Sequence, residues 1–304
     1  MASGGDTQGS FDLTPREAKI ISLGAEIRTS PPQKAEYLHT VLCQVGMPRR
    51  KIQELSFERS SGKASLLISA GKMYDGSRWV QQGLPYGSRP RLALVHICSE
   101  AARLKSPVIP IGRSIRDFMV RLNIDPNGRN FTMFRQQMNA LSACQMQLAY
   151  GTRNMTAKPI DTYDAWVGND DPRAESEIQL SQRFFDEIRE SAVPLDPRAI
   201  AALQNSSLAL DLYTWLAHRL WRVRNPNGDT VYWANLREQF GQEYVGESGE
   251  KNFKKKFLTA LDLVRQVYPT ARIERTETAF RLLASPSPIP NTKTIIDLSK
   301  KTER

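Results

Sequence analysis

The sequence is poor in cysteine and histidine, which limits the metal and redox chemistry that it can carry. It has three cysteines, far apart along the chain: Cys43, Cys98 and Cys144. No Cys-x-x-Cys pair or Cys/His cluster is present, so we expect neither a zinc site nor a disulfide framework, but buried free thiols in a reducing compartment. The three histidines are isolated, without a His-x-His pair: His39, His96 and His218.

Other absences argue against a membrane protein and against an enzyme. No run approaches the ~18 apolar residues of a membrane span, and the N-terminus lacks the apolar core of a signal peptide. Gly62-Lys63-Ala64 lacks the upstream Gly and the Ser/Thr of a phosphate-binding loop. Asp161/Asp164 and Asp170/Asp171 lie in Pro- and Gly-flanked segments, where turn residues are the expected interpretation. We therefore expect a cytoplasmic protein with no catalytic residue, no metal and no cofactor.

Basic residues exceed acidic ones, which favours a polyanionic partner. The 42 Lys and Arg residues and 32 Asp and Glu residues give a formal net charge of +10 and a pI of about 9.6. Such an excess is typical of proteins that attract nucleic acid over long range. A basic protein without such a partner has the same composition, so charge alone does not decide.

A pattern that occurs twice organises the chain. Leu92-Ala93-Leu94 and Leu208-Ala209-Leu210 each open an apolar stretch, and a cation–Asn–Phe triplet follows each: Arg129-Asn130-Phe131 and Lys251-Asn252-Phe253. The first Leu and the Phe are 39 positions apart in the first copy and 45 in the second. Each copy predicts a helix, a short strand, a helix, a basic helix and two strands. The fold class expected is α+β, mainly helical, with tandem winged-helix domains that each carry a small β-hairpin wing.

Turn signals between the periodic segments predict the domain boundaries. We expect a disordered tail over 1–12, an N-terminal winged-helix domain with preceding helices and a hairpin over 13–168, a C-terminal winged-helix domain over 176–284, and a flexible tail over 285–304. The preceding helices are predicted from Thr14 and over 35–45, the hairpin over 57–69, the linker over 169–173 and the two wings over 150–156 and 276–278.

The third helix of the second copy carries candidate DNA contacts. Its apolar face is accounted for at helical spacing by Phe253, Phe257, Leu261, Val264 and Tyr268. The remaining side chains must then face outward: Lys251, Asn252, Lys254, Lys255 and Lys256. In the major groove such cations neutralise phosphates, and Asn can bond an adenine edge. The following hairpin adds Arg272 and Arg275. The alternative is a solvated face, since three successive lysines cannot all contact one groove.

The matching helix of the first copy is less basic and richer in amides. Its candidate contacts are Arg129, Asn130, Arg135, Gln136 and Asn139, with Arg113 and Arg116 on the preceding helix, where winged helices often meet the DNA backbone. These side chains could contact base edges or phosphates. An ordinary polar face or a dimer surface is an equal alternative.

Four strings of this sequence resemble the plasmid-encoded RepA replication initiators of broad-host-range plasmids: Tyr37–Arg50, Leu84–Leu92, Tyr213–Leu220 and Asn235–Gly241. The similarity runs from about residue 35 to about residue 285. It implies binding to repeated origin sequences (iterons), opening of an AT-rich segment and recruitment of host helicase machinery. By analogy with other iteron initiators, it implies tandem winged helices whose N-terminal unit dimerises. Within Leu84–Leu92, Arg89 and Arg91 either contact phosphate or belong to a packed turn and helix cap.

We therefore expect a bacterial plasmid replication initiator that binds double-stranded origin repeats, meets a host helicase or initiator protein and forms a homodimer in part of its cycle. A transcriptional autorepressor would need the same groove contacts and remains an alternative. An enzyme such as a primase or nickase is not expected, because histidine pairs, a phosphate-binding loop and clustered carboxylates are missing. A third alternative is that the first copy serves solely as a dimer interface.

Overall fold

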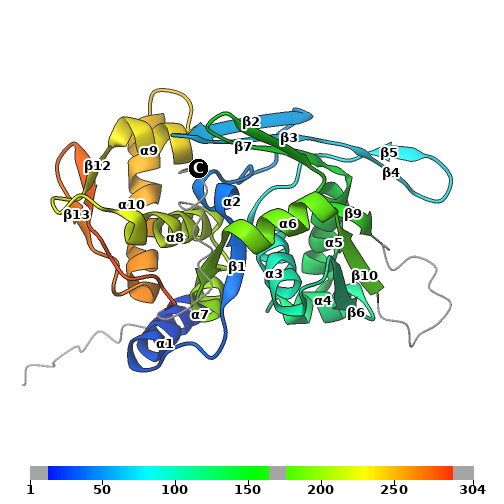
Figure 1. The fold of residues 1–304 in the computed structure, drawn as a ribbon, viewed down its shortest axis with the longest axis horizontal. Coiled ribbons are helices and arrows are strands. Elements are labelled where there is room, and N and C mark those ends of the chain that lie inside the picture. The colour runs from blue at the N-terminus through cyan, green and yellow to red at the C-terminus, as the bar shows by residue number, and fades with distance from the viewer. Residues whose placement is uncertain (1–12, 164–175, 290–304) are drawn as a thin grey trace, which may run out of the picture.

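The structure, a computed structural model, describes residues 13–163 and 176–289 and has a mixed α+β fold (Figure 1). The predicted tail over 1–12, the linker over 169–173, the carboxylates Asp164, Asp170 and Asp171, and residues 290–304 lie outside the described part of the chain. Small antiparallel sheets lie among the helices, at either side and along the top of the view (Figure 1).

The helices of the first copy lie where the repeat predicts them. They are α3 (Ser88–Leu104), α4 (Ile115–Arg121) and α5 (Gly128–Ala143), with the strand β6 (Val108–Gly112) between the first two. Ser114 caps α4 by accepting a hydrogen bond from the Asp117 backbone N–H at 3.1 Å, and Asn127 caps α5 by accepting one from Asn130 at 3.0 Å. Polar capping residues therefore fix where both helices begin.

The first predicted wing is wrong. The strands β7 (Gln145–Tyr150) and β8 (Arg153–Ala157) are joined by a tight turn at Gly151, whose φ is +61°, and not by a loop over 150–156. β8 ends at Ala157, because Pro159 has no N–H to continue the ladder. The chain then enters β9 (Ile160–Tyr163) of another sheet.

These strands join segments far apart in the sequence. The hairpin β7–β8 extends the predicted hairpin β2 (Ser56–Ser61) and β3 (Ala64–Ser69) into one sheet with the order β2-β3-β7-β8. A second sheet has the order β6-β10-β9 and contains β10 (Ser176–Leu180). A short hairpin, β4 (Lys72–Tyr74) and β5 (Trp79–Gln81), follows β3.

The segments before the first copy fit the prediction in part. α1 (Pro15–Thr29) begins at a capping box of Thr14 and Glu17, as the sequence predicts. The helix predicted over 35–45 is wrong in its first half, which is β1 (Glu36–His39), and only α2 (Thr40–Gln44) is helical. β1 is extended because it pairs with β11 (Ala192–Leu195), a long-range contact that local periodicity does not reveal. Between β10 and the second copy lie α6 (Gln182–Ser191) and α7 (Pro197–Leu203).

The second copy has the predicted order of elements. α8 (Ser207–Arg219), with a final 3-10 turn over Leu220–Arg222, precedes β12 (Asp229–Tyr232), α9 (Trp233–Phe240), α10 (Gly249–Val267), β13 (Ile273–Arg275) and β14 (Ala279–Leu282). The strands form one sheet in the order β12-β14-β13, so the hairpin predicted around 276–278 is confirmed. The core of the second copy is aromatic. Trp233 packs edge-on against Phe253, Phe257 and Phe280, at distances between ring centroids of 6.2, 5.4 and 5.0 Å.

α8 is the central helix of the molecule. Every residue from Leu208 to His218 is buried, so the apolar stretch that opens at Leu208 has no exposed face. The reason is that α8 packs against α2 and α3 on one side and against α7 and α10 on the other. A helix enclosed in this way is mostly apolar, and any charge on it, such as Asp211, needs a buried partner.

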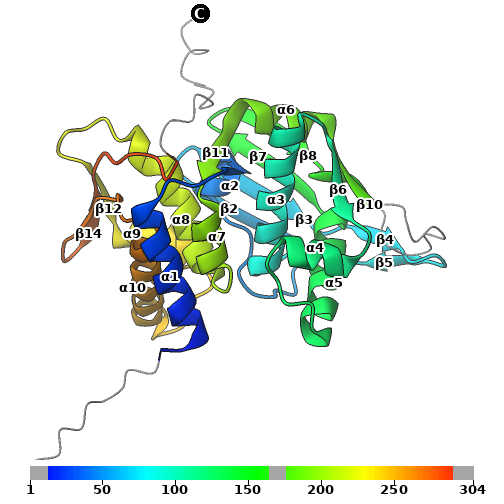
Figure 2. The same ribbon diagram turned by 90° about the horizontal axis from the view of Figure 1, so that it is seen from below.

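Packing also crosses the predicted boundary between the two copies. α1 lies against α7 and α10, and β10 pairs with β6 and β9 of the first half (Figures 1 and 2). Residues 285–289, which the sequence assigned to a flexible tail, pack on the body of the protein. There, Ser285 accepts a hydrogen bond from the Arg272 N–H at 3.0 Å, and the Tyr268 hydroxyl donates to the Pro286 carbonyl at 2.7 Å.

Candidate nucleic-acid interface

α10 presents a basic face opposite its buried face. Lys251, Asn252, Lys255 and Lys256 are exposed, whereas the aromatic and aliphatic residues at helical spacing are buried. Lys256 also lines a groove between α10, α1 and the turn after α2, to which Arg16 and Arg50 contribute. The cationic surface therefore continues from α10 towards α1.

Lys254 departs from the predicted outward face. Its side chain is 40% exposed, and its ammonium group lies 2.6 Å from the Glu250 carboxylate. The same Nζ lies 5.5 Å from the centroid of the Trp233 ring, towards α9. Lys254 follows the buried Phe253 directly, so its side chain points to the flank of the helix, where Glu250 and Trp233 lie. Lys254 is therefore already paired within the protein.

α5 presents a smaller polar face. Arg129, Arg135 and Gln136 are exposed, as predicted, and Asn139 is half-buried. The side-chain oxygen of Asn139 has no hydrogen-bond partner among the residues that the structure describes. With two cations and one exposed amide, this face has fewer charges than that of α10.

Asn130 is used inside the protein. Its side-chain Nδ2 donates to the Asp125 carbonyl at 2.9 Å, and its Oδ1 accepts from Arg89 at 2.7 Å. Both ends of the amide are therefore engaged at the start of α5, and this geometry does not present Asn130 to a base edge. The contact also places the Arg89 side chain in the packed turn at the start of α5.

The two candidate arginines near the start of α4 are exposed: Arg113 lies just before the helix, and Arg116 lies in its first turn. Arg116 donates to the Pro126 carbonyl at 3.2 Å and lies 5.5 Å from the centroid of the Phe131 ring. Arg113 has its backbone N–H bonded to the Asp117 carboxylate at 3.2 Å. Arg116 is thus held near the N-terminus of α5, where its remaining donors can still face a ligand.

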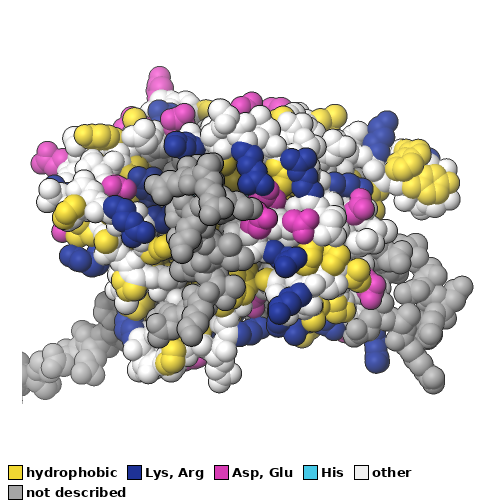
Figure 3. Space-filling view, viewed as in Figure 1, with side chains coloured by type: hydrophobic (Ala, Val, Ile, Leu, Met, Phe, Trp, Pro, Cys, Tyr) yellow, Lys and Arg dark blue, Asp and Glu magenta, His cyan; other side chains and the backbone are white. Residues whose placement is uncertain are grey.

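The hairpin of the second copy carries the last two predicted contacts. Arg272, just before β13, and Arg275, at the end of β13, are both exposed. In the view from below, α5 and α10 both lie along the lower side of the molecule, which is the side away from the viewer of Figure 1 (Figure 2). On the opposite face, cationic and acidic side chains are interspersed (Figure 3).

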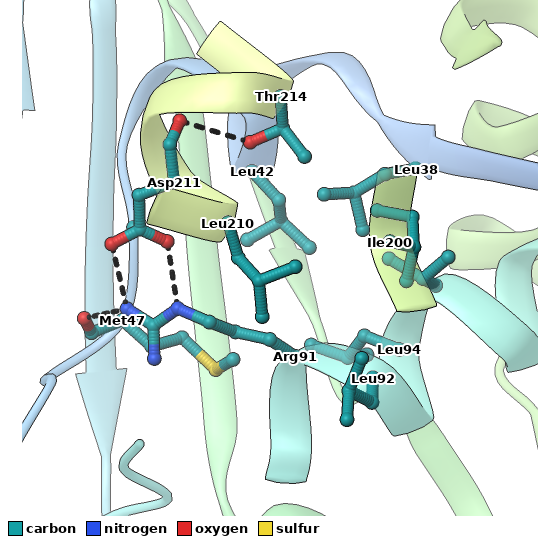
Figure 4. Close-up of a pocket in the computed structure, with 12 residues that line it drawn as sticks. Leu38, Leu42, Met47, Arg91, Leu92, Leu94, Ile200, Leu210, Asp211 and Thr214 are labelled. Carbon is teal, nitrogen blue, oxygen red and sulfur yellow. Dashed lines mark hydrogen bonds and ion pairs between the residues drawn. The ribbon is translucent and has the colours of Figure 1, made fainter. Parts of the chain in front are cut away.

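A buried ion-pair network, which the sequence analysis missed, joins the two halves of the chain. Arg91 of α3 donates to both carboxylate oxygens of Asp211 on α8, at 2.6 and 2.9 Å (Figure 4). Arg91 also donates to the carbonyls of Met47 at 2.5 Å and Pro48 at 3.1 Å. The alternative in which Arg91 contacts phosphate is therefore wrong, because its guanidinium group is buried and fully paired.

The network extends to the turn between α9 and α10. Arg49 lies 3.1 Å from the Asp211 carboxylate and 2.8 Å from that of Glu243, and it donates to the Phe240 carbonyl. Arg59 of β2 is buried and lies 3.2 Å from Glu243. Arginines from the first half thus hold the turn that leads into α10. The sequence did contain a signal: Asp211 is a lone carboxylate in an apolar helix, and a buried charge needs a partner.

The arginines keep both buried carboxylates ionised. Burial raises the pKa of Asp211, but the adjacent Arg91 and Arg49 outweigh this effect, so the pKa is lower than its ordinary 3.8. Burial also raises the pKa of Glu243, and Arg49 and Arg59 bring it below its ordinary 4.5. Desolvation acts in the other direction on Arg59, whose pKa it lowers to about 10.

The network predicts a loss of stability in acid. A carboxyl with a lowered folded-state pKa contributes stability that is complete above its ordinary pKa and is lost as the pH falls through the folded-state value. We therefore expect the free energy of unfolding to fall as the pH drops below the ordinary values of these carboxyls, 4.5 for Glu243 and 3.8 for Asp211. The Glu243→Gln variant should be less stable than the wild type at neutral pH and should show a shallower pH dependence. Urea unfolding at each pH measures the free energy of unfolding of both proteins. If it fell with pH by the same amount in the variant and in the wild type, Glu243 would not be a source of the acid sensitivity.

Within residues 13–163 and 176–289, no group of three or more His, Cys, Asp or Glu residues is placed to hold a metal ion. No helix of the described chain is both long and apolar enough to cross a membrane.

The predicted free cysteines are confirmed. Cys43, Cys98 and Cys144 are unpaired and buried. Burial raises the pKa of the Cys98 and Cys144 thiols to about 12.

Lysines and arginines gathered along one helix face are the electrostatic footprint of many nucleic-acid-binding proteins. A family model described as plasmid encoded RepA protein matches residues 84–235, half of the 304-residue chain. The chain belongs to this family of plasmid replication proteins, which confirms the family that the sequence strings predicted.

Two solved structures are similar to the chain. The crystal structure of the RctB domains 2-3 (RctB-155-483) has 13% sequence identity and a TM-score of 0.46, covering 78% of this chain and 85% of that one. The crystal structure of a selenomethionine derivative of domains 2 and 3 of RctB has 11% identity and a TM-score of 0.48, covering 77% and 86%. No curated protein matches the chain.

Proposed function

We propose that this protein is a plasmid replication initiator that binds repeated double-stranded DNA sequences at an origin, without catalysing a reaction itself. Binding of several repeats together would bend the DNA and strain a neighbouring AT-rich duplex. The observation that carries the proposal is the exposed face of α10, with Lys251, Asn252, Lys255 and Lys256, on a chain of the plasmid-encoded RepA family.

We further propose that the two copies are tandem winged-helix units. The second copy supports this with its helix, strand, helix, helix and hairpin order and its sheet order β12-β14-β13. The first copy has the same order of helices, but β6 pairs with β10, and the hairpin β7–β8 joins β2 and β3. Units over 13–168 and 176–284 remain our proposal for the domains, with α1 docked on the second unit and β10 inserted in the first.

In this arrangement, α10 lies in a major groove. Its lysines meet phosphates, Asn252 meets a base edge, and Arg272 and Arg275 of the hairpin meet the adjacent backbone. Arg129, Arg135 and Gln136 of α5, with Arg113 and Arg116, would contact a second groove. The position of α5 and α10 on one side of the molecule supports simultaneous contact (Figure 2). A first unit that serves only for dimerisation would leave these α5 residues without effect on DNA.

The partners follow from the same proposal. The protein would act in the bacterial cytoplasm, form a homodimer in part of its cycle and recruit a host helicase or initiator protein to the opened origin.

A complementation experiment tests the proposal. Supplied in trans, the wild-type protein should sustain a plasmid that carries only the cognate origin, and footprinting should show protection of repeated sequences there. A Lys251→Ala, Lys255→Ala, Lys256→Ala variant should fail in both assays while unfolding like the wild type. Transformants that lose the origin plasmid at the same rate with and without the wild-type protein would reject initiation.

The same experiment separates the runner-up function. A transcriptional autorepressor would protect DNA through the same groove contacts, but only at its own promoter, and it would not sustain the origin plasmid. Reduced promoter activity without plasmid maintenance would therefore favour the autorepressor.

A further inference from the structure

The hairpin β4–β5 projects from one end of the molecule and carries an aromatic pair that no other described element covers (Figures 1 and 2). Tyr74 is 55% exposed and Trp79 is 67% exposed, and their ring centroids are 5.7 Å apart with planes inclined by 59°. Hydrophobic side chains gather at this end in the space-filling view (Figure 3). Large aromatic side chains left in water in this way call for an explanation.

The hairpin is built as a rigid support. Asp75 closes its turn by accepting hydrogen bonds from the backbone N–H groups of Ser77 and Arg78, both at 2.9 Å. At its base, Gly71 lies against the Ala143 carbonyl at the end of α5, where a Cβ atom would come within 1.9 Å of the oxygen. Only glycine allows this approach, so the base of the hairpin is fixed to α5.

Strand alternation places the aromatic rings on one face. Tyr74 pairs with Trp79 and Lys72 with Gln81 across the hairpin, so all four side chains lie on the same side. All four are exposed, whereas Met73 and Val80, on the other side, are half-buried. The Nε2 group of Gln81 already donates to the carbonyls of Gly71 and Gln82, both at 2.9 Å. The exposed face thus combines two ring faces and a cation, with Arg78 in the adjoining turn.

This chemistry fits unpaired nucleotides. Aromatic rings stack on bases whose faces are open, and cations nearby hold the phosphates. Bases in a duplex have their faces covered by their neighbours, so such a surface selects single strands. The charge fits as well: Lys72 and Arg78 are cationic, and the one carboxylate of the turn, Asp75, is occupied by the turn hydrogen bonds and by an ion pair with Arg78 at 3.8 Å.

We propose that the Tyr74–Trp79 face of the β4–β5 hairpin binds single-stranded DNA by base stacking. The setting rests on the proposed function, because opening an AT-rich duplex exposes unpaired bases beside the bound protein. The hairpin, fixed to the end of α5, would then hold one strand of the opened segment while α10 and α5 hold the duplex.

Fluorescence anisotropy with two probes tests this inference in the full-length protein: a labelled oligothymidylate and a labelled origin duplex. The Tyr74→Ala, Trp79→Ala variant should bind oligothymidylate about 5- to 150-fold more weakly for each base that no longer stacks. Its affinity for the duplex should not change. The Tyr74→Phe, Trp79→Phe variant keeps both rings and should retain most of the single-strand affinity.

A matched control removes an exposed aromatic residue of the neighbouring sheet β2-β3-β7-β8. Tyr150 is 50% exposed and pairs with Ala64, remote in register from the start of β4, so Tyr150→Ala should leave both affinities unchanged. Equal oligothymidylate binding by the double alanine variant and the wild type would overturn the inference. The inference would also be overturned if the double alanine variant differed from the wild type only in its sedimentation coefficient, because the face would then be a contact between protein molecules. Either result leaves duplex binding, and with it the proposed function, intact, whereas failure of the wild type to bind origin duplex rejects the proposed function instead.

Discussion

The Asp211→Ala variant is expected to lose about 3–5 kcal/mol of the free energy of unfolding, because removing one partner of a buried ion pair leaves uncompensated charge. Arg91 would remain buried with no carboxylate, and Arg49 would keep only Glu243. Urea unfolding at neutral pH measures the change. The cost arises from desolvated arginines, so it should be much larger than the loss of an ordinary surface ion pair.

Asp262→Ala is the matched control for this experiment. Asp262 is also an aspartate on a helix of the second copy, but its side chain is 68% exposed and lies 3.9 Å from Arg265. Its removal should change the free energy of unfolding by less than about 0.5 kcal/mol. Replacing both members of the buried pair, Asp211→Leu with Arg91→Met, should recover part of the loss. A loss in Asp211→Ala no larger than that of the control would show that the network does not stabilise the fold.

The network also connects the stability of the fold to the proposed DNA contacts. Glu243 lies in the turn between α9 and α10, and arginines of the first half hold that turn by its carboxylate and by nearby carbonyls. The start of α10 is therefore positioned by residues far away in the sequence. If both copies bind DNA together, this link keeps α5 and α10 in a fixed relation on one side of the molecule.

Local patterns predicted the second copy well. Apolar residues at helical spacing identified the buried face of α10, and the turn around 276–278 identified its hairpin, because each signal lies within a few residues of the element that it describes. The capping residues Thr14 and Ser114 fixed the starts of two helices for the same reason. Where the outward face of a helix follows from its inward face, candidate contacts could be named from the sequence.

What could not be predicted depends on contacts between distant segments. β1 is a strand only because β11 pairs with it, and the first hairpin joins β2 and β3 through a register that no local pattern encodes. Asn130 had the residue type of a base contact, yet the neighbouring Arg89 and Asp125 engage its amide. Lys254 was assigned outward with its neighbours, yet it pairs with Glu250 on the same helix, and its ammonium group lies over Trp233, which comes from another helix.

The combined Lys251→Ala, Lys255→Ala, Lys256→Ala variant is expected to bind DNA of any sequence roughly 100-fold more weakly near 0.1 M salt, because each neutralised phosphate releases a counterion. The slope of log affinity against log salt concentration should become shallower by about 0.9 for each phosphate that the variant no longer neutralises. Lys254→Ala is the control within the same helix. Its ammonium group is already paired with Glu250 and lies over Trp233, so the slope should change least there.

Asn252 should behave differently from the lysines on the same face. Asn252→Ala is expected to cost about 1–3 kcal/mol of discrimination at one base pair and to leave the salt slope unchanged, since an interaction with a base edge releases no counterion. Salt titrations and binding to a panel of single-base variants of the repeat separate the two effects. Unaltered affinity and slope in the triple lysine variant would remove α10 from the interface, whatever the result for Asn252. A salt effect for Asn252→Ala equal to that of Lys255→Ala alone would instead place the whole helix on the DNA backbone.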